Sequence, residues 1–102
     1  MIVIRTVLQC QFGKGGELAA EFSKAAAAMQ TELGANRRWR VMTDLSGTFD
    51  TVVQEVDADS LAQWEEVRVR LFQSQSFRET MGKMQGVVVS GHNEFWHVEA
   101  EG

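Results

Sequence analysis

The sequence predicts an α+β fold in which four strands and two helices follow one another in the order β, α, β, β, α, β. Two observations predict this order. Apolar residues alternate along β-rich segments at the start, middle and end of the chain, and they recur at helical spacing in the segments between. With 102 residues, 44% of them hydrophobic, we expect one domain spanning residues 1–102.

The first strand is expected from Ile2 to Gln11, a stretch rich in β-branched residues. Because successive side chains of a strand point to opposite sides, this stretch has two unequal faces. The more apolar face carries Ile2, Ile4, Thr6, Leu8 and Cys10. The other face carries Val3, Arg5, Val7 and Gln9. We therefore expect a strand that is buried on at least one side.

The first helix is expected after the glycine-rich break FGKGGE at residues 12–17. This break lacks the spacing of a phosphate-binding P-loop, so we interpret it as a loop. Four consecutive alanines at 25–28 favour helix, and Gly34 fits the position just past the helix end. Apolar residues recur at helical spacing as Leu18, Phe22, Ala25, Met29 and Leu33.

An antiparallel hairpin is expected next. Two strand-like runs, Arg37 to Asp44 and Phe49 to Val56, are separated by the turn formers Ser46 and Gly47. Three arginines surround Trp39 in the first run. Such a cluster can bind a carboxylate or phosphate, but we favour an edge strand whose charges block pairing with another sheet.

A second helix is expected to follow, with three candidate N-caps: Asp57, Asp59 and Ser60. Its apolar face carries Leu61, Trp64, Val67 and Leu71. Within residues 73–86 we expect the helix to break and resume as a short one that ends at Gly86. The last strand then begins near Val87.

This order is the split βαβ arrangement of ferredoxin-like domains, an antiparallel sheet with both helices on one face and nothing on the other. The bare face would present Val3, Val7 and their neighbours as a large apolar patch. We therefore expect a partner on this face, and the simplest is a second copy of the chain related by a two-fold axis.

Charge and cysteine content limit the other partners and the compartment. Ten Lys and Arg against fourteen Asp and Glu give a net charge of −4, so the protein repels phosphate backbones and anionic lipids. We expect neither nucleic acid nor a membrane as a partner. The single cysteine, Cys10, cannot form an intrachain disulfide, and no apolar run is long enough to span a membrane. The cytoplasm is the expected compartment.

The middle of the chain resembles a known family in two segments, RVMTDLSGTFDTVVQEVDADSLAQWEEV at residues 40–67 and SQSF at 74–77. The motif residues are Gly47, Glu55, Ser60, Leu61, Trp64 and Phe77. They resemble the NIPSNAP-like branch of the dimeric α+β barrels, a superfamily that includes antibiotic-biosynthesis and haem-degrading monooxygenases. The resemblance implies a homodimer in which two four-stranded sheets pack into an eight-stranded barrel. Such a barrel is filled by side chains or holds one small ligand.

Both histidines lie in the last strand-like stretch, SGHNEFWHVEAEG at residues 90–102. Alternation places Asn93, Phe95, His97 and Glu99 on one face. It places His92, Glu94, Trp96 and Val98 on the other. The histidines therefore cannot share a mononuclear metal site within one chain, and His92 with Glu94 supplies too few ligands for a metal ion. We expect no metal and no other cofactor. Which face points into the barrel stays open.

Three function hypotheses follow. The first is binding of a small anionic or aromatic metabolite in the barrel by Arg5, Gln9, Glu55, Asn93 and His97. Arg5 would offset a negative charge, and His97 would orient the ligand or exchange a proton. The second is cofactor-independent oxygenation of the antibiotic-biosynthesis type, with His97 as base. The third is a filled barrel that serves only in assembly. The resemblance to haem-degrading relatives implies an asparagine on the first strand, and this strand carries Arg5 and Gln9 with no asparagine, so we do not expect haem degradation.

Overall fold

The computed structural model describes residues 1–33 and 38–102. Its elements are β1 (Ile2–Cys10), α1 (Gly15–Leu33), β2 (Trp39–Thr43), β3 (Thr51–Ala58), α2 (Leu61–Gln73), α3 (Gln75–Met84) and β4 (Val88–His97). The strands form one antiparallel sheet in the order β2-β3-β1-β4. The predicted ferredoxin-like α+β fold is confirmed. No helix in the described ranges is both long and apolar enough to cross a bilayer.

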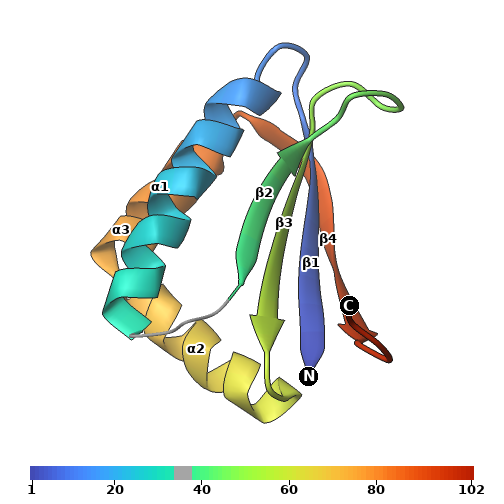
Figure 1. The fold of residues 1–102 in the computed structure, drawn as a ribbon. Coiled ribbons are helices and arrows are strands. Elements are labelled where there is room, and N and C mark those ends of the chain that lie inside the picture. Colours follow the sequence, from blue (N-terminus) through green and yellow to red (C-terminus); the bar gives the residue numbers. More distant parts are fainter. Residues whose placement is uncertain (34–37) are drawn as a thin grey trace.

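The elements form two layers, and all the helices lie on one side of the sheet (Figure 1). Strand β1 lies between β3 and β4. Met1 and Val98 lie side by side at one end of the β1–β4 pair, where the Val98 N–H donates to the carbonyl of Met1 over 3.2 Å. The sheet face turned away from the helices carries no described element (Figure 1). This is the bare face that the element order predicts.

Two serines set the bounds of α2 and α3. The hydroxyl of Ser60 accepts a hydrogen bond from the Gln63 N–H and caps α2, which selects Ser60 from the three candidates. Ser74 ends α2 and caps α3, its hydroxyl accepting from the Phe77 N–H. The expected break in the second helix therefore falls at Ser74, and Gly86 with a φ of 79° leads towards β4.

The hairpin strands differ from the expected bounds. β3 begins at Thr51, two residues later than the expected start at Phe49, because residue 50 has a positive φ of 58° that extended pairing does not allow. The expectations for Gly34 and Arg37 fall outside the described residues.

Asp50 joins the hairpin to the glycine-rich segment. Its carboxylate accepts hydrogen bonds from the backbone N–H groups of Gly13, at 2.8 Å, and Gly15, at 2.9 Å. These two bonds lower the pKa of Asp50. A Cβ atom at Gly15 would lie only 2.9 Å from Oδ1 of Asp50, so the glycine permits the close approach. In the FGKGGE segment, two backbone N–H groups thus donate hydrogen bonds to a carboxylate of the same chain.

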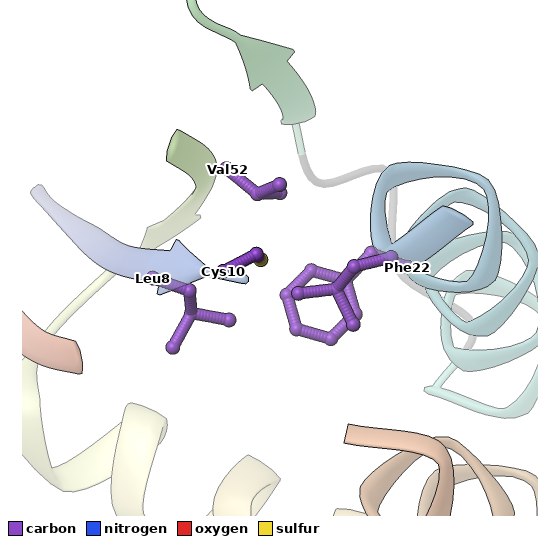
Figure 2. Close-up of a cluster of buried hydrophobic side chains, with 5 residues drawn as sticks. Leu8, Cys10, Phe22 and Val52 are labelled. Atoms are coloured by element: carbon purple, nitrogen blue, oxygen red, sulfur yellow. The ribbon is translucent and has the colours of Figure 1, made fainter. Parts of the chain in front are cut away.

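The core lies between the sheet and the helices in two clusters. One consists of Leu8, Cys10, Leu18, Phe22 and Val52, and Figure 2 shows the Phe22 ring from α1 directed towards the strand residues. The other consists of Ile2, Ile4 and Ala58, with Trp64 packed against it. Burial, together with the negative charge of Asp50, raises the pKa of the Cys10 thiol, which keeps it protonated. Cys10 is a small core residue.

Candidate functional site

The strand register determines which face of the sheet each candidate residue occupies. On β1, Arg5 lies opposite Glu55 of β3 and Glu94 of β4, so these three side chains share the uncovered face. Gln9 lies on the same face, four residues along β1. On the helix-covered face, Thr6 lies opposite Asn93.

The expected five-residue site is therefore divided by the sheet. Arg5, Gln9 and Glu55 lie on the uncovered face, whereas Asn93 and His97 lie on the face that the helices cover. A ligand on one face cannot contact both groups. The alternation had already placed Asn93 with His97, and the register now shows that their face is turned towards the helices.

A row of alternating charge crosses the uncovered face. In order from β2 to β4 it consists of Arg40, Glu55, Arg5 and Glu94, each directly opposite the next in the register. The Glu55 carboxylate accepts hydrogen bonds from Arg5 Nε, at 2.8 Å, and from Arg40. Arg5 Nη1 also lies 3.9 Å from Glu94 Oε1. Opposite charges that face each other across neighbouring strands stabilise a sheet. We call these four residues the charge row.

Glu55 is the buried member of the charge row, with 7% of its side chain exposed. Burial raises its pKa, but the hydrogen bonds and positive charges of Arg40 and Arg5 outweigh this effect, and the net pKa is lowered. Glu55 is therefore ionised at neutral pH, and its one negative charge lies between the two positive charges of Arg5 and Arg40. Arg5 already has two carboxylate partners, so it is poorly suited to offset the charge of a ligand.

Two further polar residues of the uncovered face, Glu94 and Gln9, also have partners within the chain. Glu94 accepts hydrogen bonds from His92 and Trp96, both at 3.0 Å, and these bonds lower its pKa. Gln9 donates to the Phe49 carbonyl over 2.5 Å and accepts from Thr51 over 3.1 Å. Within residues 1–33 and 38–102, no group of three or more His, Cys, Asp or Glu side chains is arranged to hold a metal ion.

The helix-covered side contains a cavity that the sequence did not predict. Its volume is about 280 Å³, close to the lower end of the range for small-molecule sites. The sheet supplies its floor through Ile4, Thr6, Leu8, Gln54, Val56 and Asn93. Helices α1, α2 and α3 supply the walls, among them the aromatic side chains Phe22, Trp64, Phe72 and Phe77. The sequence pattern placed Phe22 and Trp64 on the apolar faces of the expected helices, the positions of core residues.

Polar groups lie at defined points of this mainly apolar cavity. On the floor, the Thr6 hydroxyl donates to Oδ1 of Asn93 over 2.8 Å. On α3, the buried Thr80 hydroxyl donates to the carbonyl of Ser76 over 3.1 Å. In the sequence, the feature that indicates a polar group on this face is Thr6, which lies between Ile4 and Leu8 on the apolar face of the first strand. His97 does not line the cavity.

Comparisons with solved structures give the fold of this chain. An uncharacterised NIPSNAP domain protein from Burkholderia xenovorans has a TM-score of 0.80 at 20% identity, covering 98% of this chain and 96% of that one. A NIPSNAP family protein from Agrobacterium tumefaciens has a TM-score of 0.78 at 19% identity, covering 94% and 90%. A protein from Nitrosomonas europaea described as a "Putative antibiotic biosynthesis monooxygenase" has a TM-score of 0.77 at 7% identity, covering 98% and 100%.

At these identities the likeness shows the fold alone. The resemblance to NIPSNAP-like proteins is confirmed for the fold. The NIPSNAP structures and the structure described as a monooxygenase share the ferredoxin-like arrangement seen here. No protein-family model and no curated protein matches the chain.

The charge row generates a stability prediction. Glu55→Gln removes the carboxylate between two half-exposed arginines, and we expect it to lower the free energy of unfolding at pH 7 by about 1–2 kcal/mol. The folded-state pKa of Glu55 is lowered, so its contribution is present above the unfolded pKa of about 4.3 and is lost as the pH falls through the folded value. Urea unfolding at pH 7 and at pH 3 measures the difference.

The matched control for this measurement is Glu66→Gln, on the exposed surface of α2. We expect it to have little effect at either pH. An equal loss of stability from Glu55→Gln at both pH values would contradict the ion-pair account, since protonation at low pH removes the charge from the wild type as well.

Proposed function

We propose that the protein binds a small, mainly apolar, ring-bearing molecule in the cavity between the sheet and the helices. The observation that carries this proposal is the cavity itself, about 280 Å³ in volume and lined by aromatic and aliphatic side chains with a few polar groups. Sites for small molecules commonly combine an apolar lining with a small number of placed polar groups. The proposal keeps the metabolite-binding hypothesis and transfers it to the other face of the sheet.

The Thr6–Asn93 pair gives the cavity a means of orienting a ligand. Oδ1 of Asn93 accepts from Thr6, and within the described residues the amide nitrogen of Asn93 has no hydrogen-bond partner. An amide nitrogen carries two N–H donors, so it can bind a hydroxyl or carbonyl oxygen of the ligand. Trp64 and Phe77 line the cavity and offer aromatic contacts to a ring-bearing ligand.

Filling the cavity tests the proposal. Ala25 of α1 lines the cavity, and Ala25→Phe is expected to weaken binding of 2-naphthol or indole roughly tenfold or more, because the new ring occupies the ligand's volume. Ala20→Phe, on the exposed surface of the same helix, is the matched control and should bind as the wild type does. Isothermal titration calorimetry measures the affinities. Failure of the wild type to bind any small aromatic probe, or equal affinities for all three proteins, would contradict the proposal.

Oxygenation of an aromatic substrate in the same cavity is a second candidate function. The fold is shared with structures described as antibiotic biosynthesis monooxygenases, and the cavity places Asn93 beside an aromatic wall. In such a reaction O₂ oxidises a ring CH₂ carbon to a carbonyl; one oxygen atom enters the product and the other leaves as water. The electrons come from the substrate. His97 is not the base in this version, because it does not line the cavity.

Oxygen uptake with anthrone-like and phenolic substrates tests this second candidate. We expect uptake above a protein-free blank, and Asn93→Ala should reduce it roughly tenfold, because a hydrogen bond to the developing oxygen charge is lost. Uptake at the level of the blank, or uptake that Asn93→Ala leaves unchanged, would eliminate oxygenation through this site without affecting the binding proposal.

We also propose that the uncovered face packs against the same face of a second copy of the chain. Beside the charge row, Met42, Val53 and Val7 lie opposite one another across three strands, and Trp96 is 56% exposed. A folded protein rarely leaves such a surface in water, and a two-fold contact buries it twice. In this arrangement the charge row fills the barrel interior, as the assembly hypothesis expects, and the ligand lies outside the barrel.

Light scattering at micromolar concentration tests this assembly. We expect a dimer for the wild type and a monomer for Val7→Asp, because the substitution places an unpaired charge at the centre of the packed face. Val69→Asp, on the exposed side of α2, is the control and should stay dimeric. A monomeric wild type would contradict the proposal.

A cytoplasmic compartment is also proposed. The single cysteine is buried as a free thiol in the core, and a fold that requires no disulfide suits a reducing environment.

A further inference from the structure

We propose that the ligand of the cavity is a monoanion, an apolar ring or branched chain that carries one carboxylate, and that Arg68 binds this carboxylate. This inference rests on the proposed function of the cavity and names its ligand class. Arg68 lies on α2 and is the only charged side chain among the described residues that line the cavity. It therefore takes the role that the sequence had suggested for Arg5.

Arg68 stands where the cavity meets solvent. Its side chain is 48% exposed, and its guanidinium carbon lies 5.8 Å from the centre of the Phe72 ring, which also lines the cavity. An arginine over an aromatic face is held in orientation by the attraction between its charge and the ring. The remaining lining side chains are apolar or neutral, so an apolar body fits the interior and a charged group fits only beside Arg68.

The present partner of Arg68 leaves it able to bind a ligand. Nη2 of Arg68 lies 3.0 Å from Oε2 of Glu65, and the two side chains are 48% and 60% exposed. An exposed ion pair between neighbouring turns of one helix contributes little to stability, so its loss costs little. A guanidinium has five N–H donors in a fixed fork, which suits two parallel hydrogen bonds to a carboxylate. Arg5, held by Glu55 and Glu94, has no such freedom.

The single positive charge in the cavity lining favours a ligand with one negative charge over a ligand with two. A phosphate monoester carries close to two negative charges at neutral pH, and one half-exposed arginine beside Glu65 compensates less than one of them. The whole chain has a net charge of −4, which further disfavours a dianion. A monocarboxylate is the anion that one arginine fork matches in both charge and geometry.

A matched pair of probes separates the charge from the apolar body. 2-Naphthoate and 2-naphthamide have nearly the same shape, and only the first is charged at pH 7. We expect the wild type to bind 2-naphthoate roughly tenfold more tightly than 2-naphthamide, the effect of one charge-assisted hydrogen-bonded pair. Arg68→Gln should abolish this preference, because it removes the positive charge that distinguishes the charged probe from the neutral one. Arg68→Lys, which keeps the charge without the fork, should retain part of the preference.

Arg70→Gln is the matched control, because Arg70 lies on the exposed surface of the same helix, outside the cavity lining. It should keep the full preference, which excludes a general effect of charge on α2. If the wild type binds both probes equally, or Arg68→Gln keeps the preference, the inference is wrong and the binding proposal stands. If neither probe binds, the proposed function fails and the inference fails with it. Circular dichroism of each variant confirms that the fold is intact.

Discussion

Strand β1 lies between β3 and β4, and the alternation of its side chains decides what each side of the sheet can do. Its even-numbered residues are mostly apolar and are covered by the helices, whereas its odd-numbered residues include Arg5 and Gln9. A shift of one residue in the register would bury Arg5 beneath the helices and expose Ile4, which is 1% exposed in the structure. The core, the charge row and the cavity all depend on this one register.

The two faces carry different kinds of interaction. On the uncovered face, charges are compensated within the sheet, since Glu55 lies between Arg5 and Arg40 and no large net charge is left for a ligand. On the covered face, polar groups are few and neutral except at the cavity edge, where Arg68 stands half-exposed. A surface whose charges are already paired is suited to packing against another protein surface. A cavity with one available cation is suited to a ligand.

The fold could be predicted from the sequence because the periodicity of apolar residues indicates which side of each strand or helix is buried. The strand alternation grouped Arg5 with Gln9 and Asn93 with His97, and both groupings hold in the structure. It could not place the two groups relative to each other, because β4 has an aromatic residue on each face, Phe95 and Trp96, and only pairing with β1 distinguishes the faces. The barrel that the resemblance implies led us to expect that both groups would bind one ligand in its interior.

The cavity could not be predicted for a different reason. Aromatic residues that line a cavity and those that fill a core occupy the same positions in a helical pattern, and they differ only in how completely the volume between them is filled. Trp64 and Phe77 illustrate this, since their spacing is that of core residues although both line the cavity. Arg68 likewise has the spacing of a solvent-exposed residue. Its contact with Phe72 follows from their i,i+4 spacing on α2, whereas its place at the cavity depends on how α2 packs against the sheet.

The central claim, that the ligand binds on the helix-covered side, can be tested by the methionine methyl groups. Met81 and Met84 line the cavity, and Met42 lies on the uncovered face. Carbon-13 methyl spectra recorded during titration with 2-naphthoate report on both faces at once, because a ring current shifts only methyl groups near the ligand. The account predicts shifts for Met81 and Met84 and none for Met42. Shifts confined to Met42 would contradict it and return the site to the face that carries Arg5.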